Sequence, residues 1–176
     1  MFEVLQVPEQ RNYQAILVMP LGGCSRKLGV RIINGALTAL DFLPDNSPAR
    51  SPRDALTRRV VRQLQTYLTR PHKRFSLPLA PQGTPFQQRV WRALLQSKPG
   101  QPLTYGTLAK RLHTSARAVG NACRANPIPI IIPCHRVVSA SGLGGYSGKT
   151  RGAALALKRR LLEHERREPS SGSGTF

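Results

Sequence analysis

Three adjacent residues, Cys134, His135 and Arg136, place a thiol, an imidazole and a guanidinium side by side in the chain. A thiol of ordinary pKa, roughly 8.5, is only a few per cent thiolate at neutral pH, and nearby cations raise that fraction. The triplet therefore predicts a cysteine nucleophile at Cys134, with His135 and Arg136 supplying positive charge. The alternative is a packing role, because free cysteine is among the most often buried residue types.

The segment that must position Cys134 reads Asn-Pro-Ile-Pro-Ile-Ile-Ile-Pro at positions 126–133. Each proline fixes its own φ and disfavours a helical conformation for the residue before it. We therefore expect an extended segment rather than a helix. Adjacent side chains of an extended chain point to opposite faces, which predicts that Cys134 and His135 do not touch directly.

The sequence around Cys134 resembles the active-site signature of a known family, and further stretches follow in the family's order. These motifs are Phe86-Gln-Gln-Arg-Val-Trp91, Asn126-Pro, Pro133-Cys-His-Arg-Val137, Gly144-Gly-Tyr146 and Leu161-Leu-Glu-His-Glu165. On these residues the chain is similar to the O6-alkylguanine-DNA alkyltransferases, also called methylated-DNA-protein-cysteine methyltransferases. The resemblance covers roughly residues 84–165, whereas residues 1–83 resemble the family's variable N-terminal half only loosely.

The resemblance implies DNA repair by a protein that is consumed in one turnover. The Cys134 thiolate takes a methyl or other alkyl group from O6 of guanine, with O4 of thymine as a second candidate, and keeps it as a thioether. His135 acts as base on Cys134 through a water, and Glu165 orients His135. Asn126 holds the active-site turn. Tyr105 donates its hydroxyl to the extruded base, and a buried structural tyrosine is the alternative.

The resemblance also implies how the chain contacts DNA. Helices expected over residues 105–112 and 116–125 make a helix-turn-helix, and the small residues of the second suit either a minor groove or close helix packing. Arg117 would enter the base stack in place of the extruded nucleotide, or else bind a phosphate. The other implied DNA contacts are Ser115, Asn121, Arg124 and Arg136. The implied base pocket is formed by the Val137 carbonyl and by the lid residues Tyr146 and Ser147.

The predicted fold class is α+β, with a small N-terminal sheet-plus-helix domain at 1–83 and a mostly α-helical C-terminal domain at 84–165 that contains the helix-turn-helix. Residues 166–176 have the composition of a disordered tail. Apolar runs at 13–18, 28–33 and 36–42 predict strands, and Asn34-Gly35 predicts a hairpin between the last two.

Helix boundaries are marked by capping residues. Ser51 followed by Pro52 predicts the start of an amphipathic helix that continues to Leu68 and lies on the sheet. Thr84 followed by Pro85 predicts a second start, after which Trp91 falls on the apolar face. We assign Trp91 to the core rather than to a base-stacking surface. A last helix is expected over residues 155–165.

The charge of the chain predicts a polyanionic partner. There are 27 lysines and arginines against 8 aspartates and glutamates, and no acidic residue occurs between Asp54 and Glu163. Nucleic acid is the leading candidate and an anionic membrane surface the second. We expect double-stranded DNA containing O6-alkylguanine, bound by a monomer.

Other features bear on the compartment and on cofactors. The longest apolar run is far below the ~18 residues of a membrane-spanning helix, and no signal-peptide pattern opens the chain, so we expect a cytoplasmic protein. Three cysteines without CxxC spacing predict neither a disulfide framework nor a zinc site, and we expect no metal and no cofactor. Two alternatives stay open: a DNA-binding protein that recognises the lesion without chemistry, and a cysteine hydrolase.

Overall fold

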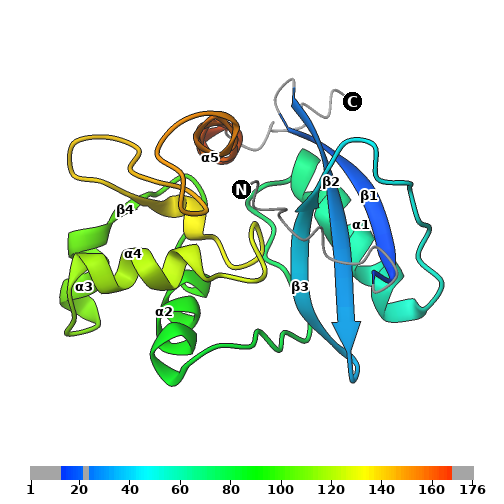
Figure 1. Cartoon of the computed structure of the whole chain (residues 1–176), viewed down its shortest axis with the longest axis horizontal. Helices are drawn as coiled ribbons and strands as arrows, with labels where there is room; N and C mark the ends of the chain where they lie inside the picture. Colours follow the sequence, from blue (N-terminus) through cyan, green and yellow to red (C-terminus); the bar gives the residue numbers. More distant parts are fainter. Residues whose placement is uncertain (1–12, 22–23, 168–176) are drawn as a thin grey trace, which may run out of the picture.

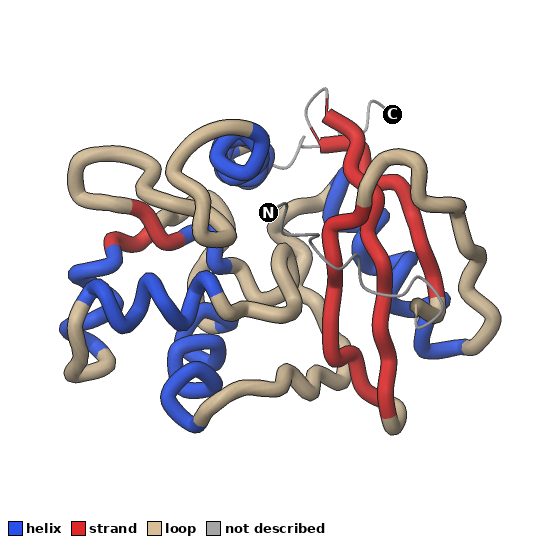
Figure 2. The backbone as a smooth tube through the Cα atoms, in the orientation of Figure 1, coloured by secondary structure: helices blue, strands red, loops and turns tan. Residues whose placement is uncertain are grey.

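The computed structural model describes residues 13–21 and 24–167. In Figure 1 a sheet with one covering helix, α1, stands beside a part built mostly of helices, and helix α5 lies near both. Figure 2 shows that most of the strand structure is in the first part, while the second consists of helices and long loops with a short pair of strands. The chain is therefore an α+β protein, as its sequence predicts.

The sheet is a three-stranded antiparallel meander in the order β1-β2-β3. Its strands are β1 (Ala15–Leu21), β2 (Cys24–Ile33) and β3 (Ala36–Leu43). Asn34 and Gly35, between β2 and β3, have φ values of 50° and 74°. Both values fit a two-residue hairpin turn of the type that Asn-Gly favours, so the predicted hairpin is confirmed.

Helix α1 (Ala55–Thr69) packs on this sheet through Val60 and Leu64, which are buried. The expected start at Ser51 is wrong, because the helix begins after Asp54. The Asp54 carboxylate accepts a hydrogen bond from the Thr57 backbone N–H at 2.8 Å, which is the N-cap interaction that Ser51 was expected to make.

Helix α2 (Pro85–Leu95) begins as its sequence predicts. Thr84 accepts from the Gln87 N–H while the Gln87 side chain accepts from the Thr84 N–H, a reciprocal capping box. Trp91 is 1 % exposed and its Nε1 donates to the Ala122 carbonyl at 2.9 Å, so the assignment of Trp91 to the core is confirmed.

The described residues contain three further α-helices: α3 (Tyr105–Arg111), α4 (Ala116–Arg124) and α5 (Ala153–Arg166). Thr104 and Ser115 cap α3 and α4 through their side-chain oxygens. Strand β4 (Leu103–Thr104) pairs in parallel with β5 (Val137–Val138), which joins the start of α3 to the chain beyond Cys134. Because α5 extends to Arg166, the expected disorder is wrong at residue 166, and residues 168–176 of the expected tail lie outside the described part.

No helix within residues 13–21 and 24–167 is long and apolar enough to cross a membrane. The same residues contain no cluster of three or more histidine, cysteine or acidic side chains that could hold a metal ion.

Candidate active site

The segment before Cys134 is a compact turn, so the expected extended conformation is wrong. The Asn126 side chain closes the turn: its Nδ2 donates to the Ile132 carbonyl at 2.7 Å and its Oδ1 accepts from the Ile128 N–H at 3.0 Å. Ile130 has a φ of 72°, which is costly for a β-branched residue. The prolines exclude a regular helix, and the Asn126 amide stabilises the reversal of direction that they permit.

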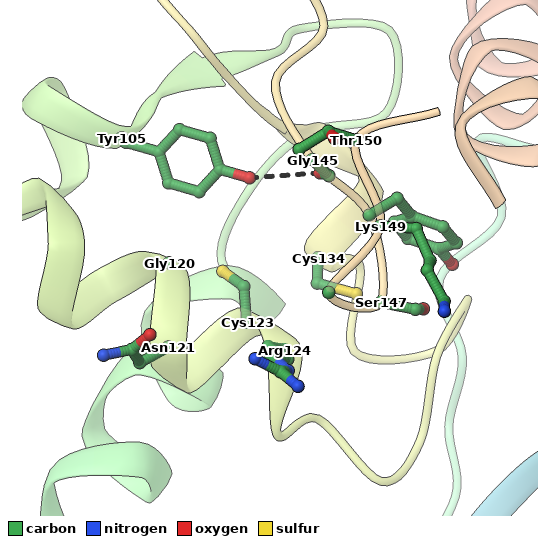
Figure 3. Close-up of a pocket in the computed structure, with 12 residues that line it drawn as sticks. Tyr105, Gly120, Asn121, Cys123, Arg124, Cys134, Gly145, Ser147, Lys149 and Thr150 are labelled. Atoms are coloured by element: carbon green, nitrogen blue, oxygen red, sulfur yellow. Dashed lines mark hydrogen bonds between the residues drawn. The ribbon is translucent and has the colours of Figure 1, made fainter. Parts of the chain in front are cut away.

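Cys134 begins a short 3-10 helix, Cys134–Arg136, directly after this turn. Its side chain is 6 % exposed and lines a pocket of about 250 Å³. Helices α3 and α4 contribute one wall of the pocket through Tyr105, Asn121 and Cys123, and residues 145–150 contribute the other (Figure 3). The structure thus places the predicted nucleophile in a small cavity at the side of α4.

Burial raises the pKa of the Cys134 thiol above its ordinary value, while a hydrogen bond from Asn126 and the charge of Lys158 oppose that rise. Cys134 is consequently a thiol at neutral pH. The expectation that His135 and Arg136 increase its thiolate fraction is wrong, because the side chains of those residues are directed to Glu165. Cys134 therefore needs a base that removes its proton before it can act as a nucleophile.

Glu165 of α5 binds the side chains of the two residues that follow Cys134. His135 Nε2 lies 2.7 Å from Glu165 Oε1, and the Arg136 guanidinium donates through Nε and Nη2 at 2.9 and 3.0 Å. Tyr67 of α1 donates its hydroxyl to the same carboxylate at 2.9 Å. One buried carboxylate therefore connects the active-site turn, α5 and the N-terminal part of the fold.

The protonation of this cluster makes His135 a suitable base. Burial raises the pKa of Glu165, but hydrogen bonds from His135 and Arg136, together with the Arg136 charge, outweigh it and hold that pKa at about 2. Burial lowers the pKa of His135, so its imidazole is neutral near pH 7 and donates from Nε2 to the carboxylate. The other ring nitrogen, Nδ1, is buried without a hydrogen-bond partner among the described residues and is left as the proton acceptor.

Arg136 is a correction to the expected DNA contacts. It is 7 % exposed, and besides Glu165 it donates through Nη1 to the Ser97 carbonyl at 2.6 Å. A guanidinium whose donors are engaged in the interior is not available to a phosphate. Arg136 instead stabilises the ionised form of Glu165.

Lys158 is a site residue that motif reasoning missed. It is buried on α5, and its Nζ donates to the carbonyls of Val137 and Gly145 at 2.6 and 2.9 Å. Burial lowers the pKa of Lys158 to about 8. A signal was present, because helical spacing puts Lys158 on the same face as Leu161, Leu162 and Glu165.

The implied pocket residues occupy different positions around the cavity. The Tyr105 hydroxyl donates to the Gly145 carbonyl at 3.3 Å (Figure 3), and burial followed by the neighbouring thiols raises its pKa to about 12. Tyr146 is buried and Ser147 is exposed, and both line the pocket. The Val137 carbonyl accepts from Lys158 and has a second lone pair.

The implied DNA contacts, apart from Arg136, lie on or beside α4. Arg117, Asn121 and Arg124 are exposed, and the last two line the pocket. Ser115 is also exposed, and its hydroxyl already accepts from the Ala118 N–H at 3.1 Å as the cap of α4. The three side chains of α4 are thus exposed to solvent, and the Ser115 side chain caps the N-terminus of the helix.

The free energy of unfolding is expected to fall as the pH is lowered from 7, because the folded protein holds His135 neutral and Glu165 ionised. The unfolded chain binds a proton on His135 below about pH 6.5 and on Glu165 below about 4.5, which the folded state resists until lower pH. Stability is therefore lost first below pH 6.5. About 3 kcal/mol more is lost between pH 4.5 and about 2 through Glu165.

Urea unfolding measured between pH 7 and 3 checks this expectation. An Asp54→Asn variant is the control, because it removes an exposed carboxylate whose pKa is also lowered and should leave the loss below pH 6.5 in place. A free energy of unfolding that stays constant from pH 7 to 3 would contradict the assigned charge states.

The fold and site together define an α+β protein in which a buried cysteine, backed by a neutral histidine and a carboxylate, opens into a pocket beside an exposed basic helix. Residues 85–167 match the family model described as 6-O-methylguanine DNA methyltransferase, DNA binding domain. The methylated-DNA--protein-cysteine methyltransferase of Methanosarcina mazei is 43 % identical over 137 residues, which is 73 % of this chain and 84 % of that protein. The chain belongs to the methylated-DNA--protein-cysteine methyltransferase family.

Solved structures agree with this assignment. Mycobacterium tuberculosis OGT in complex with DNA is 38 % identical with a TM-score of 0.67, and the match covers 86 % of this chain and 91 % of that chain. The O6-methylguanine DNA methyltransferase of Methanococcus jannaschii is 29 % identical with a TM-score of 0.65, covering 92 % and 98 %.

Proposed function

We propose that this protein repairs DNA by transferring a methyl or other alkyl group from O6 of guanine to Sγ of Cys134. The observation that carries the proposal is the position of Cys134, a buried thiol in a pocket of about 250 Å³ with the His135–Glu165 pair behind it. The family names support the same reaction. The size of alkyl group that fits, and any action on O4 of thymine, depend on the pocket wall formed by residues 145–150.

The reaction begins with the thiol proton. His135 Nδ1 accepts this proton through a bridging water, and Glu165 stabilises the imidazolium that results. The Cys134 thiolate attacks the alkyl carbon, a carbon–sulfur bond forms, and the carbon–O6 bond breaks with its electrons left on guanine. Asn126 and Lys158 stabilise the thiolate before the attack.

Tyr105 assists the departure of guanine. Its raised pKa keeps the hydroxyl protonated, so it can donate to the anionic base once it exchanges the Gly145 carbonyl for the base. The product is a thioether, which no described group can reduce or hydrolyse. The protein is therefore consumed in one turnover.

DNA presents the lesion to this pocket through helices α3 and α4, which we take to be a helix-turn-helix. An alkyl group on guanine O6 is out of reach inside a duplex, so the nucleotide must leave the stack. Arg117, exposed in the first turn of α4, fills the space that it vacates, while Asn121, Arg124 and the backbone beside Ser115 contact the strand. Residues 1–83 form the supporting domain, residues 84–165 the reactive one, and one copy acts alone.

Mass spectrometry of the intact protein and of its peptides tests the reaction. After mixing with duplex DNA that contains one O6-methylguanine, the peptide containing Cys134 should gain one methyl group in step with loss of the lesion. Tight binding without a mass change would leave a protein that only recognises the lesion. Repeated turnover without modification of the protein would instead indicate a hydrolase.

Replacing Lys158 with methionine is expected to slow methyl transfer about tenfold to a hundredfold. Methionine keeps the volume but removes a charge that lowers the Cys134 pKa and two hydrogen bonds, each worth about 1.5–3 kcal/mol when a charged group donates. Single-turnover rates measured with excess protein report the change. Lys149→Met is the matched control, because Lys149 lines the same pocket but is exposed, and an equal loss in both variants would contradict a specific role for Lys158.

A further inference from the structure

Three adjoining hollows, which we call the furrow, are lined in large part by residues of α1, of α2 and of the long connection between them, whose course Figure 1 shows. The volumes of the hollows are about 330, 600 and 350 Å³. The first and second share Lys73, Arg74 and Phe75, and the second and third share Leu79 and Leu95, so the three adjoin. None of the residues that line the reactive pocket lines this furrow.

The rim of the furrow is cationic. Six exposed cations line it and no aspartate or glutamate does: Arg59, Arg62, Lys73, Arg74, Arg92 and Lys98. Arg59 donates to the Ser76 hydroxyl, but none of the six is in an ion pair with another described residue. The charge of the furrow therefore suits an anionic occupant.

The floor of the furrow is mainly aliphatic, and this decides between classes of anion. It includes Leu77, Leu79 and Leu95, of which Leu95 is 39 % exposed. Besides the core residue Trp91, its rings are Phe75, which is half-buried against Tyr67, and the exposed imidazole of His72. Single-stranded nucleic acid gains about 1–3 kcal/mol for each base stacked on an aromatic side chain, and a duplex presents phosphates that leave an apolar floor unused. A peptide with aliphatic and acidic side chains uses both floor and rim.

The furrow also reaches the back of the active-site segment. Pro133 and Arg136 line its central hollow, whereas Cys134 between them lines the reactive pocket. An occupant of the furrow consequently touches the turn that carries the nucleophile, without entering the pocket that receives the base.

We propose that the furrow is a docking surface for a partner protein, which binds through an acidic segment that carries aliphatic side chains. The carboxylates of that segment pair with the six cations of the rim, and its aliphatic side chains cover Leu77, Leu79 and Leu95. The proposal does not depend on alkyl transfer, so the two can fail separately.

Fluorescence anisotropy with the full chain tests the surface. The probe is a fluorescein-labelled peptide of Asp-Glu-Leu-Leu repeats, and the comparison peptide has serine in place of leucine. A variant with Lys73→Glu and Arg74→Glu is expected to bind the probe at least about tenfold more weakly. The matched control carries Arg53→Glu and Arg58→Glu, the same change of charge on exposed side chains outside the furrow, and is expected to bind within about twofold of the parent.

A further variant, Leu95→Ser, tests the floor without changing charge. This variant should have a lower affinity for the leucine-containing probe. Its affinity for the serine-containing peptide, which is lower from the start, should not change. Equal losses in the two charge variants, or equal affinity for the two peptides, would overturn the proposal, since either result means non-specific attraction.

Two other results would reassign the furrow. If the Lys73→Glu and Arg74→Glu variant binds a single-stranded oligonucleotide more weakly but binds the peptide as before, the surface binds nucleic acid.

Residues 168–176 follow Arg167, whose carbonyl lies 3.2 Å from Nε2 of His72 in the furrow. If the peptide binds only after these residues are removed, the occupant is the chain's own C-terminal segment.

Discussion

A Cys134→Ser variant is expected to bind duplex DNA containing O6-methylguanine and to acquire no methyl group, whereas Cys123→Ser reacts at close to the parent rate. Both thiols are buried and line the same pocket, so position alone does not separate them. Burial, followed by the nearby Cys134, raises the pKa of Cys123 to about 12. Cys134 has the hydrogen bond from Asn126 and follows the turn that Asn126 closes. A serine hydroxyl at that point is a far weaker nucleophile.

Loss of the lesion and gain of protein mass, followed together in single-turnover conditions, measure this difference. DNA affinity is the control for folding, because neither replacement changes charge or removes more than one sulfur atom. If the Cys134→Ser variant is still methylated and the Cys123→Ser variant is not, Cys123 is the residue that accepts the methyl group and Cys134 is not.

Replacing Glu165 with glutamine is expected to lower the free energy of unfolding by about 3–5 kcal/mol, because the Arg136 charge is then buried without its counter-ion. An amide offers one acceptor oxygen to the donors of His135, Arg136 and Tyr67 that now share a carboxylate. The rate of methyl transfer should also fall by about a hundredfold or more, since the imidazole loses the charge that favours its role as a base.

Urea unfolding and single-turnover kinetics, both at a temperature at which the variant stays folded, measure the two effects separately. Glu163→Gln removes an exposed carboxylate of the same helix and should change stability by no more than about 0.5 kcal/mol. A Glu165→Gln variant that keeps the parent's rate would remove Glu165 and His135 from the proton transfer.

Local features of this protein follow from its sequence because they depend on residues close together in the chain. The Asn34-Gly35 turn, the Thr84–Gln87 capping box and the Ser115 cap are each complete within a few residues, and the structure contains all three. The pattern of apolar residues assigned Trp91 to the core for the same reason. Cys134 was predicted as a nucleophile from the triplet that it forms with His135 and Arg136, and the resemblance of the motifs supported it and identified the other residues at the pocket.

Only the tertiary structure decided how those residues act. His135 and Arg136 precede Glu165 by about thirty positions, and their pairing depends on how α5 packs against the active-site turn and α1. That packing buries Arg136 instead of exposing it to DNA, and it raises rather than lowers the Cys134 pKa. Proline geometry excluded a helix at 126–133, but the side-chain hydrogen bonds of Asn126 selected the turn.

Lys158 shows the same division between sequence and structure. Its spacing along α5 was visible in the chain, since it shares a helical face with Glu165. The sequence could not show that the carbonyls of Val137 and Gly145 meet over that face and accept both of its hydrogen bonds. A lysine is buried only where such partners are brought to it, and those partners come from segments that the fold alone places together.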